Sequence, residues 1–134
     1  MYRTIVVGTD GTPRAAQAVD QAAVLAQIYD ATLHVVHAYQ STQGPVVRAA
    51  ETVARLVTSE LEGRRLDGQA LDVQTHTMLG HPADVVLDLA FTCGADLIVV
   101  GNRGMSGKGR ILGSVPNAIA HSAHCAVLIV PTSD

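Results

Sequence analysis

Hydrophobic and polar positions along the chain fall into two patterns that alternate from one end to the other. Short, almost continuous apolar runs such as Leu97–Val100 are typical of strands buried on both faces of a parallel sheet. Between the runs, apolar residues recur every three or four positions, as at Val46, Ala50 and Val53, which indicates one buried face of a helix. The runs predict strands at Thr4–Val7, Leu33–Ala38, Asp96–Val100 and Ala126–Val130. Alternation with polar neighbours predicts a half-exposed strand at Leu71–Thr77, and the helical stretches lie at about 13–29, 46–61, 83–93 and 116–123.

Several boundaries carry residues that start or stop a helix. Thr12 can cap the first helix, with Pro13 at its first position. Gly94 can end the third helix in a left-handed conformation, and Asp67-Gly68 marks a turn before the third strand. Five strands in strict alternation with four helices imply right-handed crossovers. The fold class is therefore α/β, with an open, doubly wound, mainly parallel sheet covered on both faces.

Composition supports one compact domain over residues 1–134. Hydrophobic residues make up 48% of the chain and charged residues 16%, which argues against disorder. The net charge of −3 gives no reason to expect nucleic acid or an anionic membrane as a partner. No apolar run reaches transmembrane length, and Cys93 and Cys125 lack metal or redox spacing. The chain is expected in the cytoplasm, with both cysteines as small buried thiols.

The six histidines invite a metal site, but their spacing does not favour one. His34 and His37 are three apart on a predicted strand, so their side chains face opposite sides of the sheet. His121 and His124 could share one face of a helix with Cys125 nearby, although that cysteine is expected in the strand. Surface histidines without a metal are the better interpretation.

The candidate chemistry lies at the ends of the first and fourth predicted strands. Gly8–Gly11 follows the first strand, and the stretch from Gly101 through Arg103 to Gly104 follows the fourth. Eight residues later, Gly113-Ser114 precedes a helix, whose free N–H groups would attract an anion. Basic residues without any acidic ones surround these glycines, which is what a phosphate-bearing ligand requires. The basic residues are Arg103, Lys108 and Arg110.

Each of these features has a plainer interpretation. The basic segment could be an ordinary solvated loop, and Asp10 could serve only the turn that starts the first helix. The glycines match neither a P-loop nor a dinucleotide fingerprint. No nucleophile–base pair or pair of carboxylates accompanies them, so ligand binding is favoured over catalysis.

The chain resembles the small, single-domain universal stress proteins. That family's ATP-binding members carry Gly, two residues, Gly, nine residues, then Gly and Ser or Thr; here the second gap, between Gly104 and Gly113, has eight. The resemblance extends over nearly the whole chain and includes the segments Ile5–Thr12, Leu33–Val36, Gly80–Ala83, Asp96–Gly101, Gly113–Pro116 and Val127–Pro131.

The resemblance implies a Rossmann-like sandwich with strand order 3-2-1-4-5. It also implies binding of ATP or a related adenine nucleotide, with or without Mg²⁺. Thr9, Asp10 and Val35 would hold the nucleoside. Val100 and Gly101 would line the adenine and ribose side. The phosphates would contact Gly104, Gly113, Ser114 and Val115, beside the basic Arg103.

The resemblance further implies a stress-response regulator that forms a homodimer through Ala126–Val130. The plainer interpretation of that segment is the last strand of the sheet, covered by a helix. Two other functions remain open from the sequence: a nucleotide-free dimerisation or adaptor module, in which the shortened loop has lost its ligand, and a slow ATPase.

Overall fold

A computed structural model describes residues 1–66, 68–102 and 112–133 of the chain. Five parallel strands form the main sheet in the order β5-β2-β1-β6-β7. Set in chain order, these are the third, second, first, fourth and fifth strands, so the predicted topology is confirmed. The strands are β1 (Thr4–Gly8), β2 (Thr32–Tyr39), β5 (Val73–Leu79), β6 (Leu97–Gly101) and β7 (Ala126–Val130).

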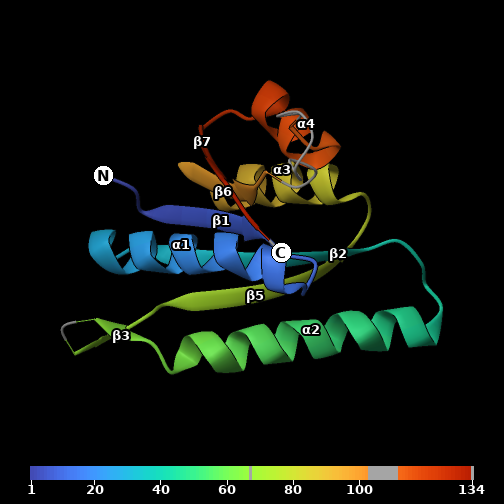
Figure 1. The fold of residues 1–134 in the computed structure, drawn as a ribbon, viewed down its shortest axis with the longest axis horizontal. Coiled ribbons are helices and arrows are strands. Elements are labelled where there is room, and N and C mark those ends of the chain that lie inside the picture. The colour runs from blue at the N-terminus through green and yellow to red at the C-terminus, as the bar shows by residue number, and fades with distance from the viewer. Residues whose placement is uncertain (67, 103–111, 134) are drawn as a thin grey trace.

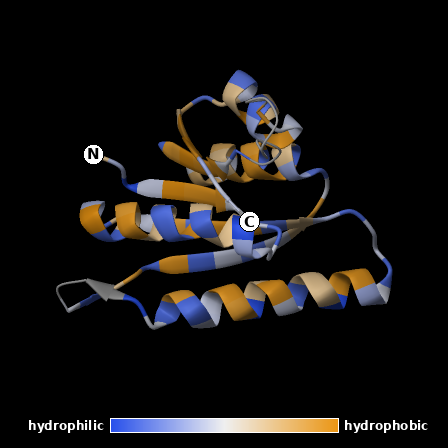
Figure 2. Cartoon of the chain, viewed as in Figure 1, coloured by the Kyte–Doolittle hydropathy of each residue, from blue (hydrophilic) through white to orange (hydrophobic). Residues whose placement is uncertain are grey.

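Helices cover both faces of this sheet (Figure 1). α1 (Pro13–Tyr29) and α2 (Gly44–Glu62) lie on one face, and α3 (Pro82–Cys93) and α4 (Ser114–Ser122) lie on the other. β7 is apolar throughout, whereas β5 carries several polar residues. In the helices, hydrophobic and hydrophilic residues alternate along the ribbon, as Figure 2 shows most clearly for α2. No helix of the described residues is both long enough and apolar enough to cross a membrane.

The core forms two layers because successive side chains of a strand point to opposite faces. On β1, Ile5 and Val7 pack toward α1, whereas Val6 packs toward α3, and all three are fully buried. The buried face of α1 consists largely of alanines, which lets this helix approach the sheet closely. A loop of only four residues joins β1 to α1, so the first turn of this helix lies at the end of β1, beside the candidate site.

The structure confirms two predicted helix ends, the start of α1 at Thr12 and the end of α3 at Gly94. Thr12 accepts a hydrogen bond from the Ala15 N–H at 3.2 Å, with Pro13 next in the helix. Gly94 ends α3 with φ +67°, and its N–H bonds back to the last turn of the helix. Both residues lie as the sequence predicts.

Three predictions need correction. A two-stranded hairpin, β3 (Arg65–Leu66) with β4 (Gln69–Ala70), precedes β5, and β5 starts at Val73, where its pairing with β2 begins, and not at Leu71. α4 begins at Ser114, two residues before Pro116, because a proline in the first turn loses no hydrogen bond. His34, expected at the surface, is only 8% exposed and stacks on His76 of the neighbouring strand.

Candidate functional site

The candidate site lies at the carboxyl end of β1, where the direction of winding reverses. From β1 the chain crosses through α1 to β2 on one side, and it later returns through α3 to β6 on the other side. The loops that leave β1 and β6 therefore diverge to opposite faces of the sheet. A crevice opens between such loops in doubly wound folds, and ligands bind there.

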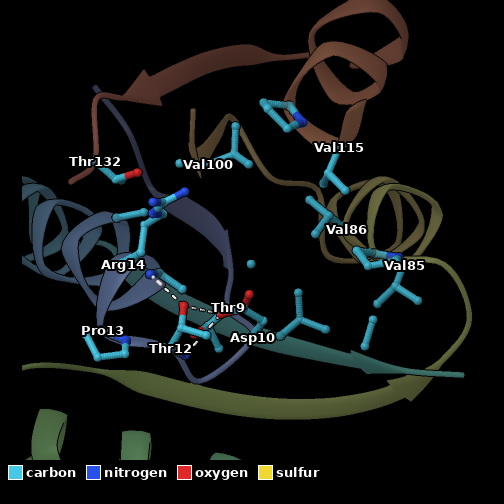
Figure 3. A pocket seen from close by; sticks show the side chains of 18 residues that line it. Thr9, Asp10, Thr12, Pro13, Arg14, Val85, Val86, Val100, Val115 and Thr132 are labelled. Carbon is cyan, nitrogen blue, oxygen red and sulfur yellow. Dashed lines mark hydrogen bonds between the residues drawn. The ribbon is translucent and has the colours of Figure 1, made fainter. Parts of the chain in front are cut away.

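The loop after β1 is held in shape by its own side chains. Oδ1 of Asp10 accepts hydrogen bonds from the N–H of Thr12 at 3.0 Å and from its hydroxyl at 2.6 Å. The hydroxyl oxygen of Thr9 accepts a bond from the Gly11 N–H at 3.1 Å. Asp10 therefore does the turn chemistry that the plainer interpretation assigned to it. It also lines the pocket described below (Figure 3).

Neighbouring elements hold the same loop from outside. The Thr9 N–H donates to the carbonyl of Val36 at 2.9 Å, and Nδ1 of His37 lies 2.9 Å from the Thr9 carbonyl. Gly11 has φ +80°, and a Cβ there would come within 2.9 Å of Val53 on α2. A side chain at position 11 would therefore both strain the backbone and displace α2.

The end of β6 is tied to the segment that follows β7. Asn102 is 5% exposed, and its N–H donates to the carbonyl of Val130 at 2.9 Å. Its Oδ1 accepts bonds from both the N–H of Thr132 at 3.0 Å and the hydroxyl of Thr132 at 2.8 Å. This places Thr132 beside Gly101, on the wall of the crevice.

The start of α4 closes another side of the site. Gly113 is the residue before the helix, and a glycine has no side chain with which to cap it. Pro116 has no N–H, so the free donors of this first turn belong to the residues before it. The next residues of the turn, Val115 and Pro116, line the crevice.

These parts enclose a cavity of about 480 Å³, which falls within the range of small-molecule sites. One wall is polar and comes from the β1 loop, the start of α1 and Thr132 (Figure 3). The facing wall is apolar and comes from α3 and α4, with Val85, Val86 and Val115 (Figure 3). A ligand with one flat apolar part and one polar or charged part would match this division.

The structure brings together half of the residues predicted from the sequence. The predicted residues that line the cavity are Thr9, Asp10, Val100, Gly101 and Val115. Gly113 and Ser114 adjoin Val115 at the start of α4, and Arg103 and Gly104 lie outside the described residues. Their contact with a nucleotide stays a prediction.

Val35 is placed elsewhere. Its side chain is fully buried in the core layer under α1, and the cavity is lined instead by Val36, the next residue on β2. The physical reason is the alternation of side chains along a strand, which turns Val36 and Ala38 toward the crevice and Val35 away from it.

Sequence reasoning missed other lining residues. Arg14 stands in the first turn of α1, and Thr132 comes two residues after β7. Pro82, Val85 and Val86 come from the first turns of α3. A usable signal existed for Arg14, because the first turn of the helix that follows β1 must border any site at the carboxyl end of that strand.

The described part of the chain contains no group of three or more metal-ligating side chains placed to hold a metal ion. The pair of the buried His34 and the half-buried His76 lies outside the cavity, with 2.9 Å between Nδ1 of the first ring and Nε2 of the second. Burial, and for His34 also the neighbouring ring, hold the pKa values of both below 6.5. The site thus offers polar anchors and an apolar wall without a metal centre among the described residues.

Comparison with known proteins gives a consistent result. A sequence model of the Universal stress protein family matches residues 1–131. Universal stress protein Rv1636 of Mycobacterium tuberculosis is 38% identical over 145 aligned positions, which cover 98% of each chain. Universal stress protein A homolog 1 of Coxiella burnetii is 35% identical, and the match covers 96% of each chain.

A solved structure adds a ligand to the comparison. The crystal structure of a universal stress protein in complex with cAMP superposes with a TM-score of 0.82, at 37% identity and 98% coverage of both chains. A universal stress protein from Archaeoglobus fulgidus superposes with a TM-score of 0.79 at 25% identity, covering 99% of this chain and all of the other.

Proposed function

The chain belongs to the universal stress protein family, and on that premise we propose that it binds an adenine nucleotide in the cavity between β1 and β6. The observation that carries the proposal is the position and make-up of the cavity. It lies at the reversal of strand order, with an apolar wall on one side and polar anchors on the other. The similar structure solved with cAMP supports this class of ligand.

Each part of a nucleotide has a matching part of the site. The flat base would pack against Val85 and Val86 on the apolar wall. The ribose would lie near Thr9 and Asp10, whose side chains border the polar wall. The phosphate would approach the first turn of α4, where free N–H groups and the helix dipole attract an anion. Gly104 and Arg103, outside the described residues, remain predicted phosphate contacts.

We propose that nucleotide binding acts as a signal and not as a step in catalysis. Ser114 is the first residue of α4, at the proposed phosphate end, and the described cavity lining offers one carboxylate, that of Asp10. Efficient phosphoryl transfer requires a positioned base and metal ligands beyond this. The function then falls in stress-response regulation in the cytoplasm, where the unpaired thiols of Cys93 and Cys125 would stay reduced.

Isothermal titration with cAMP, AMP, and ATP with and without Mg²⁺ tests the proposal directly. We expect binding of at least one of these at millimolar concentration or below, and weaker binding of GTP. The variant Ala38→Phe fills the cavity from β2 and should abolish binding. Ala49→Phe, which adds the same side chain on an exposed position of α2, is the matched control and should bind like the native chain.

Three outcomes would contradict the proposal or redirect it. A native chain that binds no adenine nucleotide would favour a nucleotide-free adaptor module. Equal binding by native chain and Ala38→Phe would place the nucleotide elsewhere. Release of phosphate from ATP above background over hours would instead support a slow ATPase.

We further propose that two copies pair through β7. This strand is the last of the sheet, and its outer edge has no partner strand among the described residues. The Val130 carbonyl accepts the Asn102 N–H, so it points toward β6. Because backbone groups alternate in direction along a strand, the N–H and carbonyl of Ile129 point outward, toward a second copy.

This directionality gives a sharp test of the dimer. Ile129→Pro removes an outward N–H without removing a bond to β6, and proline is tolerated at strand edges of this kind. We expect it to convert the dimer to a folded monomer in light scattering after size exclusion. Leu128→Pro, which removes a bond to β6, should instead destabilise the fold. A native chain that is monomeric at high concentration would overturn the dimer.

A further inference from the structure

The two cysteines of the chain are far apart in the sequence but lie at the same end of the sheet. Cys93 is the last residue of α3, and Cys125 directly precedes β7. The pairing of β6 with β7 begins one residue after Asp96 and one residue after Cys125, so these two residues lie beside each other. A second contact joins the same segments, because the rings of Phe91 on α3 and His124 lie 6.4 Å apart between centroids. The end of α3 and the start of β7 are therefore neighbours.

Both thiols lie along one stretch of backbone. The two side chains are half-buried, and both pack against the core layer under α3 and α4. The backbone of Ala95 stabilises the thiolate form of Cys93 through a hydrogen bond, and the backbone of Ile98 does the same for Cys125. Ala95 and Ile98 belong to the short stretch that leads from α3 into β6. The fold thus brings together two thiols that no motif in the sequence connects.

The electrostatics of the two thiols agree with this placement. Burial raises the pKa of both thiols, and at Cys125 the charges of Asp96 and of a Cys93 thiolate raise the pKa further. Such an interaction weakens with distance, so the two sulfurs share one electrostatic neighbourhood. Because both groups are protonated at neutral pH, they react slowly and stay reduced unless an oxidant persists.

We infer that Cys93 and Cys125 form a reversible disulfide when the chain meets a hydroperoxide. The bond would connect the end of α3 to the start of β7. It would close a covalent ring that contains β6, α4 and the predicted phosphate contacts Gly104 and Gly113. Such a ring stabilises the native chain because it restricts the unfolded one. The pair is therefore a redox-sensitive device of the fold, which requires no nucleotide and goes beyond nucleotide binding.

Formation of the bond takes two electrons from the sulfurs and reduces one hydrogen peroxide to two waters. The Cys93 thiolate attacks one peroxide oxygen and the O–O bond breaks, which leaves a sulfenic acid; the departing hydroxide takes up the proton that the Cys93 thiol has lost. The Cys125 sulfur then attacks the sulfur of the sulfenic acid. The S–S bond forms, the S–O bond breaks, and the second water leaves with the Cys125 proton. Cys93 reacts first because the carboxylate of Asp96 disfavours the thiolate at Cys125.

Intact-mass spectrometry of the full chain after treatment with hydrogen peroxide and then iodoacetamide tests the inference. The native chain should lose the mass of two hydrogen atoms and take up no alkyl group, and dithiothreitol should reverse the change. Peptide mapping without reduction should give one linked pair of peptides that contains both cysteines. The matched variants Cys93→Ser and Cys125→Ser each keep one thiol, so they should gain oxygen atoms or remain open to alkylation.

Three results would overturn the inference. The first is a native chain that keeps both thiols under conditions that convert free cysteine to cystine. The second is a gain of oxygen atoms on each sulfur without a link between them. The third is a link that joins two chains and not two segments of one chain.

Urea unfolding of the oxidised chain gives a second readout. The midpoint of the linked native chain should rise by about 1 M or more and return after reduction, because the ring restricts the unfolded state. Cys93→Ser treated in the same way should keep its midpoint. An unchanged or lower midpoint in the linked chain would show that the bond does not fit the native fold, which also overturns the inference. Nucleotide titration of the reduced chain is independent of each of these results, so the proposed function stands or fails separately.

Discussion

The hydrogen bonds of the Asn102 side chain predict how much this side chain, at the end of β6, contributes to the free energy of unfolding. Oδ1 of Asn102 accepts two hydrogen bonds from Thr132, one from the N–H at 3.0 Å and one from the hydroxyl at 2.8 Å. Asn102 is 5% exposed, so water cannot easily replace these bonds. The variant Asn102→Ala removes the acceptor for both donors.

The two bonds to Thr132 set the least cost that we expect. Each intramolecular hydrogen bond contributes about 1 kcal/mol net, so two give about 2 kcal/mol. This corresponds to a fall of about thirtyfold in the equilibrium between folded and unfolded chain. Thr132→Val removes only the hydroxyl bond and should cost about 1 kcal/mol.

The double variant separates the shared bond from other effects. Once Asn102 is alanine, the Thr132 hydroxyl has already lost this partner, so adding Thr132→Val should cost little more. The cycle should show a coupling free energy of about 1 kcal/mol. As a control, Thr58→Val removes a hydroxyl that bonds Thr75, and it should add its full cost to that of Asn102→Ala.

Urea unfolding followed by circular dichroism measures all of these free energies. The midpoint should shift while the slope against urea stays constant, because the surface exposed on unfolding hardly changes. A cost below about 0.5 kcal/mol for Asn102→Ala, or full additivity with Thr132→Val, would refute the reasoning from these bonds.

Three further predictions concern local features of the fold. Gly94→Ala should cost about 1 kcal/mol in urea unfolding, because φ is +67° while a Cβ there meets nothing within 4 Å; a cost near zero would contradict the backbone argument. Thr12→Ala should cost about 1 kcal/mol by loss of the cap on the Ala15 N–H, and amide exchange should rise in the first turn of α1 and not elsewhere. Lowering the pH below 6.5 should destabilise the native chain more than the variant His34→Asn/His76→Gln. Folding lowers the pKa of both histidines, so the unfolded chain takes up protons that the fold resists; parallel pH profiles of the two chains would speak against this.

The layout of the fold could be predicted because its signals are local. The apolar runs of β1 and β6 and the periodic apolar face of α2 each determine an element within a few residues. Thr12 and Gly94 mark helix ends through bonds to neighbouring residues in the chain. The β3–β4 hairpin escaped prediction because strands of two residues are too short to show a periodic pattern.

The walls of the site could be predicted only in part, because they depend on side-chain direction and on contacts between distant segments. On β2, Val36 lines the cavity and the adjacent Val35 points to the opposite face of the sheet. In an apolar run such as this one, the sequence does not indicate which residues point to which face. Thr132 is held at the cavity by its bonds to Asn102, thirty residues earlier in the chain. The burial of His34 could not be predicted from its neighbours in the sequence, because the ring that stacks on it, His76, lies on a strand that is distant in sequence.

Hydrogen bonds at the ends of β1 and β6 connect the loops of the cavity to neighbouring strands of the sheet. The β1 loop is fixed by Val36 and His37 of β2, and the β6 end is fixed by Thr132 after β7. These hydrogen bonds connect the cavity to β2, the neighbour of β1, and to the segment after β7, the neighbour of β6. A change that shifts β2 or β7 should therefore move the polar wall of the cavity, whereas a change in the β3–β4 hairpin should leave that wall in place. Ligand affinity should follow the stability of these hydrogen bonds, so Asn102→Ala should weaken nucleotide binding together with folding.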